Sequence, residues 1–557
     1  MSCRKTPSLI VAVTLLMLFA VDLYPVNISI DPEIKYQQFE GWGTSLCWWA
    51  VLAGKWSENR RNELIGAIVD PDTGLGYNCF RYNIGGGDQP GHTHLAEARA
   101  VPGFKASENA PYDWTADVNQ RNILLGIADR GKDLIFEAFS NSPPWWMTIS
   151  GCASGNTNGA DNLKPEYFSA FADYLTTVVK QYKEQWGITF RTVEPFNEPS
   201  SGYWKKDGGQ EGCGFKSGQS RMVKELGEQL KSKELFPQTT VSAADETSLE
   251  QTFNTFKSYD DSAFSFVSQI NSHSYGGWRF RSAVDSLAKA HDKNLWQSES
   301  GPLEKSDNSD IAMWMSHLII QDLRVMKANA WLDWQVCDPV GDWITIELNH
   351  STQTFKYTKR YYMHAAFSRF IRPGSQIIHS SDTNSVAAID KDSKNLIVIQ
   401  RNERPNSNVY IFDLSKFNLS DSAPSVFRFT TNGGLQRVED FEIGDKQISY
   451  IAPGMSITTC VIPILENPVN SPAPAEKAGR PSLTWSGSLL RFTLRSGAPY
   501  KLSIYDAMGK RIRTQRMTGF HENSIDMRDI GLAAGTYVAE LVQGGTQMKT
   551  RFIITDQ

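Results

Sequence analysis

The sequence has few cysteines, little net charge and only one long apolar run, and two of these shortages exclude whole classes of protein. Fifty-six Lys and Arg against 61 Asp and Glu leave a formal net charge of −5 in 557 residues, whereas a nucleic-acid-binding protein normally carries a basic excess. Hydrophobic residues make up 40% of the chain and charged residues 21%. That balance excludes a largely disordered chain and a protein with many membrane spans.

The seven cysteines are scattered along the chain and form no recognisable metal-binding pattern. Cys3 stands near the start, and the others are Cys47, Cys79, Cys152, Cys213, Cys337 and Cys460. Because no C-x-x-C pair and no histidine-rich spacing accompanies them, we expect no metal site and no cofactor. Cys152 and Cys213 both lie in glycine-rich segments and could form a disulfide in an exported protein. Buried free thiols are equally consistent with the others.

The one long apolar run lies at the N-terminus and predicts export. Arg4 and Lys5 precede an apolar stretch over residues 9–21, and Asp22 follows it. This stretch is too short to span a bilayer, and a short apolar run after a positive segment is typical of a secretory signal peptide. The prediction is a signal peptide over residues 1–22, with an uncleaved N-terminal anchor as the alternative.

Strand-like and helix-like segments alternate through most of the chain. Eight apolar segments have the pattern of strands, at residues 39–48, 77–83, 134–139, 189–196, 240–244, 266–273, 295–299 and 330–335. Helical patterns fall between many of them, for example at residues 58–69, 117–129, 165–186, 219–233 and 310–326. Eight such alternations predict an α/β chain with a closed (β/α)8 TIM barrel over residues 39–362. The alternative is a doubly wound open sheet, although no G-x-G-x-x-G follows the first strand.

The remainder of the chain is predicted to be all-β. Residues 23–38 and 363–465 show short strand patterns without long helices, which predicts a β-sandwich side domain built from both flanks of the barrel. Residues 466–482 are rich in proline and alanine and predict a linker. Residues 483–557 predict a small all-β C-terminal domain.

Two glutamates occupy special places in the predicted barrel. Glu198 follows the fourth strand and Glu299 ends the seventh, so both are expected at the face where barrel chemistry occurs. Hydrolysis of a glycosidic bond needs one carboxylic acid to protonate the leaving oxygen and one carboxylate to meet the anomeric carbon. Asn197, directly before Glu198, is well placed to bond a sugar hydroxyl. No G-x-S-x-G motif supports a serine hydrolase instead.

Other strand ends supply residues suited to sugar binding. Arg81 on the second strand could hold the nucleophile ionised, and His273 and Tyr275 after the sixth strand could donate hydrogen bonds near Glu299. The chain has 16 Trp and is 11% aromatic, and the C–H faces of sugar rings stack on indole. The tryptophans predicted to bind substrate are Trp48, Trp145, Trp146, Trp331 and Trp334.

Six segments together resemble glycoside hydrolase family 30. They read FEGWGTSLCWWA at 39–50, RYNIGGGD at 81–88, SNSPPWWM at 140–147, EPFNEP at 194–199, WQSESG at 296–301 and FSRFIRPG at 367–374. The first looks most like the endo-β-1,6-galactanase branch. The resemblance implies a barrel with a β-sandwich side domain and a retaining mechanism, with Glu198 as acid/base and Glu299 as nucleophile. The C-terminal segment resembles the sorting domain of Bacteroidetes type IX secretion.

These resemblances give a specific expectation of activity and location. We expect a secreted or cell-surface monomer that hydrolyses β-1,6-galactan side chains of plant arabinogalactan-type polysaccharide. Its partners would be the polysaccharide or oligosaccharide substrate and the outer-membrane secretion machinery, and no nucleic acid. β-1,6-Glucanase, xylanase and glucosylceramidase-like activities stay open as alternatives, as does a non-catalytic glycan-binding protein.

Overall fold

The computed structural model of the chain describes residues 25–302, 310–339, 341, 343–444, 446–465, 482–486, 489–493, 500–517, 523–526, 532–543 and 546–554. The expected signal peptide and almost all of the expected linker lie outside these residues. None of the helices in the described segments is long and apolar enough to cross a membrane.

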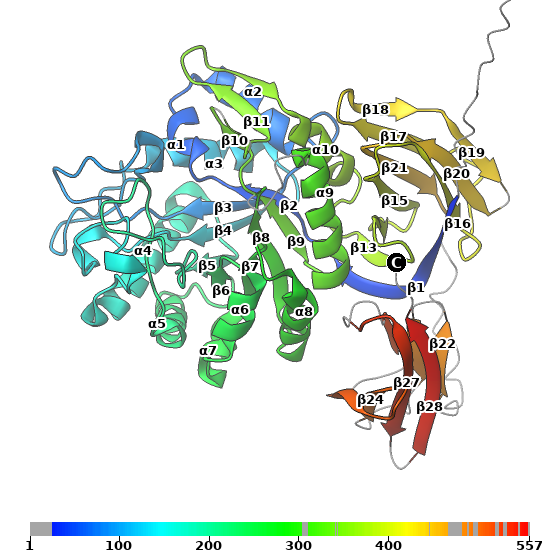
Figure 1. Ribbon diagram of the computed structural model, residues 1–557. Helices are drawn as coiled ribbons and strands as arrows, with labels where there is room; N and C mark the ends of the chain where they lie inside the picture. The colour runs from blue at the N-terminus through cyan, green and yellow to red at the C-terminus, as the bar shows by residue number, and fades with distance from the viewer. Residues whose placement is uncertain are drawn as a thin grey trace, which may run out of the picture.

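Eight parallel strands close into a barrel, which confirms the predicted (β/α)8 fold (Figure 1). They are β2 (Gly41–Ser45), β3 (Cys79–Asn83), β4 (Ile135–Phe139), β5 (Thr192–Glu194), β6 (Thr240–Glu246), β7 (Val267–His273), β8 (Asn294–Ser300) and β9 (Ala330–Asp333). Strand β2 pairs with both β3 and β9, so the ring has no open edge. The alternative of an open sheet is therefore wrong.

Helices follow the strands and cover the outside of the barrel. The α-helices are α1 (Trp49–Ala53), α2 (Glu58–Val69), α3 (Val118–Arg130), α4 (Phe168–Trp186), α5 (Gln219–Ser232), α6 (Leu249–Phe256), α7 (Asp261–Phe266), α8 (Arg281–Ala290), α9 (Ile311–Gln321) and α10 (Lys359–Ser368). The shorter turns are η1 (Glu97–Arg99), η2 (Trp145–Met147), η3 (Thr157–Gly159), η4 (Pro165–Tyr167), η5 (Trp278–Phe280) and η6 (Asp322–Met326).

Local sequence explains several helix ends. The side chains of Ser248, Asp260 and Asp310 accept hydrogen bonds from the first free backbone N–H groups of α6, α7 and α9. Helix α4 ends at Gly187, whose φ of 69° suits a residue without a Cβ. These signals are local, so the sequence alone accounts for these four helix ends.

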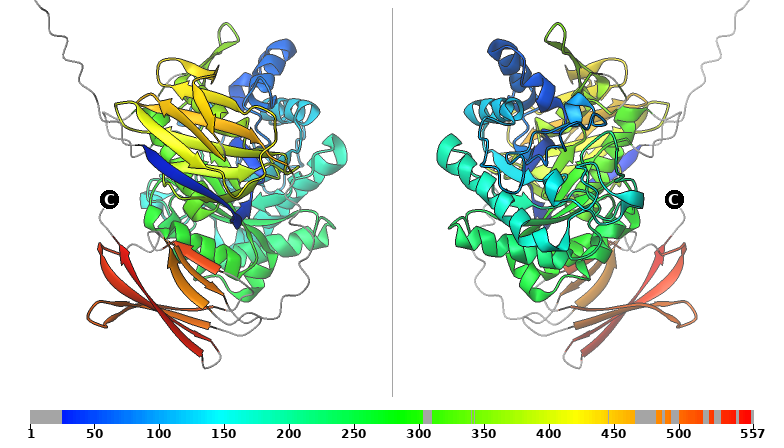
Figure 2. Two further views of the ribbon diagram at one scale, coloured as in Figure 1. Left: turned by 90° about the vertical axis from the view of Figure 1, so that its right-hand side faces the viewer. Right: turned by 90° about the vertical axis from the view of Figure 1, so that its left-hand side faces the viewer.

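A ten-stranded sheet lies beside the barrel and folds into a sandwich (Figures 1 and 2). Its strands run in the order β18 (Gly434–Val438), β17 (Ser425–Thr430), β21 (Ser456–Pro463), β15 (Asn395–Asn402), β14 (Ser385–Ile389), β13 (Gln376–Ser380), β1 (Val26–Gln38), β16 (Asn408–Asp413), β20 (Gln447–Ala452) and β19 (Phe441–Gly444). The first residues of β1 pair with β16 and its later residues pair with β13. This N-terminal strand therefore joins the two halves of the sandwich.

The alternating faces of the sandwich strands bury two different cores. Leu396 and Val398 face the sandwich interior with Phe412 and Tyr450. Ile397 and Ile399 belong to the main core shared with the barrel helices, and α9 and α10 contact this face. Burial on both faces makes these strands continuously apolar and attaches the sandwich firmly to the barrel.

Two small β units complete the described structure. Strands β10 (Cys337–Asp338), β11 (Ile346–Asn349) and β12 (Thr354–Tyr357) form a sheet in the loop after β9. The C-terminal part contains β22 (Ser482–Ser486), β23 (Leu489–Thr493) and β26 (Asn523–Asp526) in one sheet. A second sheet holds β25 (Arg511–Met517), β24 (Tyr500–Asp506), β27 (Gly535–Gln543) and β28 (Thr546–Ile554). The two sheets share a separate core that contains Leu490, Leu502 and Phe552.

Every cysteine in the described residues is buried and free. The disulfide considered between Cys152 and Cys213 is therefore absent from this structure. The Cys152 thiol instead contacts polar side chains of neighbouring loops.

Candidate active site

Glu198 lies in the loop after β5 and is fixed through its backbone. Its φ of 51° falls in the left-handed region that residues with a Cβ rarely adopt. Its N–H donates to the carbonyl oxygen of Asp245 at 2.8 Å, and its own carbonyl oxygen accepts a 2.9 Å hydrogen bond from Nε1 of Trp204. Strained backbone of this kind persists only when surrounding contacts determine it, so the position of this carboxylate is set by its neighbours.

Glu299 lies on β8 and is held by two donors. The Tyr275 hydroxyl donates a 3.0 Å hydrogen bond to its Oε1, and Nη1 of Arg81 lies 3.5 Å from its Oε2. Burial is the largest influence on the pKa of Glu299 and raises it to about 7. His273 and Arg81 lower the pKa of Glu299, and Glu198 raises it further. The two donors favour the charged carboxylate that a nucleophile needs.

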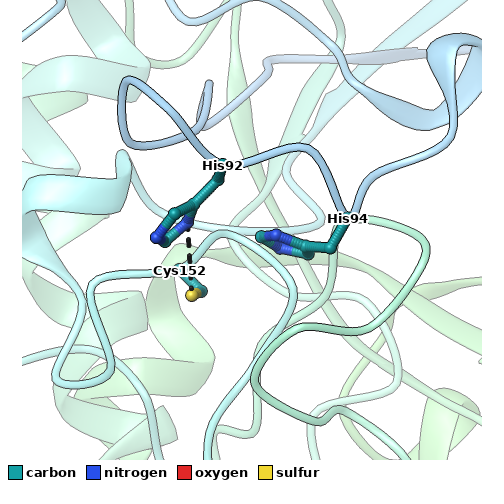
Figure 3. A group of neighbouring side chains, drawn as sticks. All are labelled: His92, His94 and Cys152. Atoms are coloured by element: carbon teal, nitrogen blue, oxygen red, sulfur yellow. Dashed lines mark hydrogen bonds between the residues drawn. The ribbon is translucent and has the colours of Figure 1, made fainter.

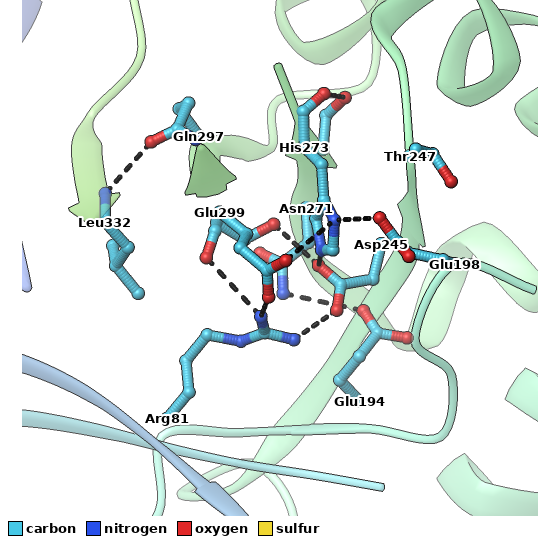
Figure 4. A network of polar contacts seen from close by, with 12 residues as sticks. Arg81, Glu194, Glu198, Asp245, Thr247, Asn271, His273, Gln297, Glu299 and Leu332 are labelled. Carbon is cyan, nitrogen blue, oxygen red and sulfur yellow. Dashed lines mark hydrogen bonds and ion pairs between the residues drawn. The ribbon is translucent and has the colours of Figure 1, made fainter. Parts of the chain in front are cut away.

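The two glutamates approach one another around His273 (Figure 4). Nδ1 of His273 lies 3.0 Å from Oε1 of Glu198 and 3.5 Å from Oε1 of Glu299. One carboxylate oxygen of each glutamate and one histidine nitrogen lie within 4.8 Å of one another. A retaining glycosidase holds its two carboxyl groups about 5–5.5 Å apart, and an inverting one about 6.5–9.5 Å. The nearest oxygens of the pair are closer than the inverting range, which favours the retaining kind.

Arg81 is fully buried beneath the pair and contacts three carboxylates. Its Nε lies 2.9 Å from Glu137, its Nη2 forms an ion pair with Asp245, and Nη1 reaches Glu299. Burial disfavours the guanidinium charge, but these carboxylates outweigh burial and raise the pKa of Arg81. The sequence predicted Arg81 beside Glu299, and the structure places it there. Its contacts with Glu137 and Asp245 are shorter than its contact with Glu299.

Asp245, at the end of β6, is a central residue that sequence reasoning missed. Oδ1 accepts a 2.6 Å hydrogen bond from the hydroxyl of Ser298 and lies 3.1 Å from Nε2 of His273. Burial would raise the pKa of Asp245, but Arg81 and His273 outweigh it and hold the pKa at about 2. A signal was present, because Asp245 directly follows the predicted strand 240–244.

Two further buried acids lie deeper in the barrel. Glu137 accepts hydrogen bonds from Arg81, Gln269 and Asn271. Burial raises the pKa of Glu194 well above its usual range, and the Asp245 and Glu137 carboxylates raise it further. The shift favours the protonated form of Glu194 over its carboxylate.

Asn197 is buried, and its Oδ1 has no hydrogen-bond partner among the described residues. A buried polar atom without a partner is costly, and a hydroxyl of a bound sugar would satisfy it. The structure thus leaves this oxygen available for the use predicted from the sequence.

The predicted tryptophans divide between the site and the core. Trp48 and Trp334 form an edge-to-face pair with ring centroids 6.3 Å apart. The backbone N–H of Trp334 donates to the carbonyl oxygen of Ser300, the residue after Glu299. Trp343, which was not predicted, lies 6.0 Å from the Tyr275 ring. Trp145 packs against the main core, and its role stays a prediction.

The structure places two of the predicted tryptophans away from the glutamate pair. Trp331 is 1% exposed, and its Nε1 donates to Asp322 on η6, outside the barrel wall. Trp146 donates to the carbonyl oxygen of Lys105 and packs edge-on against Tyr167. Trp146 lines a small separate cavity that contains no residue of the Glu198–Glu299 network. Trp331 is enclosed by protein and offers no face to a sugar, so that prediction is wrong, whereas the role of Trp146 stays a prediction.

Comparison with known proteins gives a consistent result along the chain. The model of O-glycosyl hydrolase family 30 matches residues 25–293, and the model of the secretion system C-terminal sorting domain matches residues 489–555. An endo-β-1,6-galactanase of Hypocrea rufa is 32% identical over 73% of this chain and 88% of its own length. An exo-β-1,6-galactobiohydrolase of Bifidobacterium longum is 24% identical over 72% of this chain but only 36% of its own length.

Solved structures share the fold. A conserved exported protein from Bacteroides fragilis is 20% identical with a TM-score of 0.67, and the alignment covers 78% of this chain and 100% of that one. The catalytic domain of xylanase C, a family 30 enzyme from Talaromyces cellulolyticus, is 19% identical with a TM-score of 0.62 over the same shares.

Proposed function

The chain belongs to glycoside hydrolase family 30, and from this premise we propose that it is a retaining hydrolase of β-1,6-linked galactan with Glu299 as nucleophile and Glu198 as acid/base. The chain is an O-glycosyl hydrolase by membership of the family, and its C-terminal sorting domain marks it as secreted or cell-surface. The proposal concerns the substrate and the roles of the residues.

The single observation that carries the mechanism is the short distance between the two carboxylates. With one oxygen of each within 4.8 Å, a substrate carbon can be attacked by Glu299 while Glu198 protonates the leaving oxygen. The bond from the anomeric carbon to the leaving oxygen breaks, and a bond from Glu299 to that carbon forms. A water molecule then gives its proton to Glu198 and its oxygen to the anomeric carbon, which releases Glu299.

The neighbouring residues support this division of roles. Tyr275 and Arg81 both donate to Glu299, so they stabilise the carboxylate that leaves the sugar in the second step. Asn197 precedes the acid/base and offers an unpaired oxygen to a hydroxyl of the sugar. His273, which contacts both glutamates, fixes their relative position.

The substrate proposal rests on the two relatives, because both are named for β-1,6-galactose linkages. We expect release of short galactose oligomers from de-arabinosylated arabinogalactan, the plant polysaccharide whose β-1,6-galactan side chains the enzyme would reach outside the cell. Product lengths over time separate an endo-acting from an exo-acting enzyme.

The test is a product assay on de-arabinosylated arabinogalactan, β-1,6-glucan and xylan under one set of conditions, with Glu299→Gln as the blank. Faster release from arabinogalactan than from the other two supports the proposal. Faster release from β-1,6-glucan or xylan would assign another activity of the family. No release from any of them would favour a glycan-binding protein without turnover.

A further inference from the structure

A second group of chemically active side chains lies in the loops at the strand ends, separate from the Glu198–Glu299 network. Figure 3 shows His92, His94 and Cys152 with their polar ends turned toward one another. One nitrogen of each histidine and the cysteine sulfur lie within 4.8 Å of one another. His92 and His94 come from the loop after β3, and Cys152 from the loop after β4.

The distance between the Cys152 sulfur and a His92 nitrogen matches that of two ligands around a small tetrahedral metal ion. Zinc binds sulfur at about 2.3 Å and imidazole nitrogen at about 2.0–2.1 Å, which places the two ligand atoms about 3.6 Å apart at a tetrahedral angle. The Cys152 Sγ and His92 Nδ1 lie 3.6 Å apart.

The carboxylate of Asp88 adds oxygen ligands on the histidine side of the group. Its Oδ1 lies 3.4 Å from Nδ1 of His92, and its Oδ2 lies 3.6 Å from Nε2 of His94. Two imidazoles, a thiol and a carboxylate are the donor types that zinc prefers.

The surroundings leave the group open to an ion from solvent. The two imidazole side chains are 27% and 15% exposed, which leaves an entry path, while Cys152 is buried. Asp207, from the loop after β5, lies 3.7 Å from the Cys152 sulfur. Three loops that follow consecutive barrel strands therefore meet at this cluster.

We propose that His92, His94 and Cys152 form a zinc-binding site that ties the loops after β3 and β4 together, with Asp88 as the nearest carboxylate to complete the ligand set. Binding replaces the thiol proton of Cys152 with a sulfur–zinc bond and releases that proton to solvent. The site adds to the proposed function and does not depend on it.

A chain of hydrogen bonds links the loop that carries Cys152 to Glu198, the proposed acid/base. Near Cys152, the N–H of Asn156 donates to the carbonyl oxygen of Trp204, and Nε1 of Trp204 donates to the carbonyl oxygen of Glu198. An ion that fixes the β4 loop thus also fixes the contact that positions Glu198. This arrangement gives the zinc a structural role in the loops around the substrate.

The test uses the full chain after dialysis against EDTA, kept reduced, and titrated with ZnCl2 by calorimetry. A second histidine–carboxylate group, Glu198, His273 and Glu299, could bind zinc itself. The titration is therefore repeated in a Glu198→Gln/Glu299→Gln background. We expect one equivalent of zinc in both proteins, and a rise in Tm on binding.

Variants and a spectroscopic probe identify the ligands. Zinc binding should weaken by at least about 100-fold in the double variant His92→Asn/His94→Asn and in Cys152→Ser. It should weaken by about 10–100-fold in Asp88→Asn. The matched control Cys213→Ser should bind zinc as the unaltered chain does. With CoCl2 in place of zinc, a thiolate-to-cobalt charge-transfer band should appear and should be lost in Cys152→Ser. If Cys152→Ser does not fold, the histidine double variant and the cobalt spectrum of the unaltered chain decide the matter. Absence of binding, or cobalt binding without the charge-transfer band, would overturn the proposal.

Discussion

Nε2 of His273 lies 3.1 Å from Oδ1 of Asp245, so the imidazole that contacts Glu198 and Glu299, the proposed catalytic pair, also faces a buried carboxylate. The pKa of His273 is raised: burial opposes the imidazolium, but Glu299 and Asp245 outweigh it. An imidazolium donates from both nitrogens. In this structure Nδ1 is within hydrogen-bond distance of Glu198, and Nε2 lies at ion-pair distance from Asp245.

Removing the charge of Asp245 should destabilise the protein. Asp245→Asn removes a buried negative charge that lies beside Arg81 and His273. We expect the free energy of unfolding to fall by about 3 kcal/mol or more. The pKa of Asp245 in the folded protein, about 2, lies below its ordinary value. The stability that ionised Asp245 contributes is therefore complete above about pH 4 and is lost as the pH falls toward 2. Chemical denaturation at pH 7 measures the loss.

The matched control is Asp260→Asn, which makes the same substitution at an exposed helix cap whose pKa is also about 2. Asn caps a helix about as well as Asp, so its effect should be much smaller than that of Asp245→Asn. Equal losses in the two variants would contradict the importance assigned to burial.

Glu299→Gln should reduce kcat by at least about 10⁴-fold, because the amide cannot form the glycosyl–enzyme bond. The variant should keep its Tm within a few degrees, since the amide fills the same space. Exposed Glu250→Gln serves as the control and should leave the rate unchanged. Substantial turnover by Glu299→Gln would remove Glu299 from the role of nucleophile.

Glu198→Ala should lose about 10²–10⁴-fold on a polysaccharide, where the leaving sugar needs a proton, and much less on an aryl galactoside with a good leaving group. Added azide should restore turnover of the aryl substrate and give a glycosyl azide of retained configuration, because Glu299 still forms the intermediate. An azide product of inverted configuration would exchange the roles of the two glutamates.

The acid limb of kcat/KM should inflect near pH 7, because Glu299 must be ionised and burial raises its pKa to about 7. Tyr275→Phe removes a donor to the charged carboxylate. The pKa of Glu299 should therefore rise and the limb should move about one pH unit upward. Tyr112→Phe, in the separate cavity that Trp146 also lines, should leave the limb in place. An unchanged limb in Tyr275→Phe would contradict the assignment.

Substitutions of Trp331 and Trp334, which flank Leu332 and Asp333 in the sequence, should have opposite effects on KM and on stability. Trp334→Ala should raise KM about tenfold through loss of a stacking surface, with little change in Tm. Trp331→Phe should leave KM unchanged and lower the free energy of unfolding by about 1–3 kcal/mol, because it loses the bond to Asp322 and part of a packed core. Measuring KM and unfolding for both variants tests the assignment, and a raised KM in Trp331→Phe would contradict it.

Sequence alone was enough to identify the barrel, both glutamates and the family. Strands such as β7 and helices such as α4 carry patterns that depend only on neighbouring residues, and Glu198 and Glu299 stand at recognisable strand ends. Barrel closure then places all strand ends on one face. The two carboxylates therefore meet without any information about distant contacts.

Tertiary structure decided which residues beyond the predicted Arg81, His273 and Tyr275 join them. Trp331 faces outward because alternate residues of a strand point to opposite sides, and the register of β9 against β2 and β8 sets which side is which. Asp245 reaches His273 and Arg81 from a different strand, and His92, His94 and Cys152 meet from separate loops. Such contacts depend on the packing of segments far apart in the chain. A local pattern can mark Asp245 as the end of a strand, but it does not give the partners that meet it there.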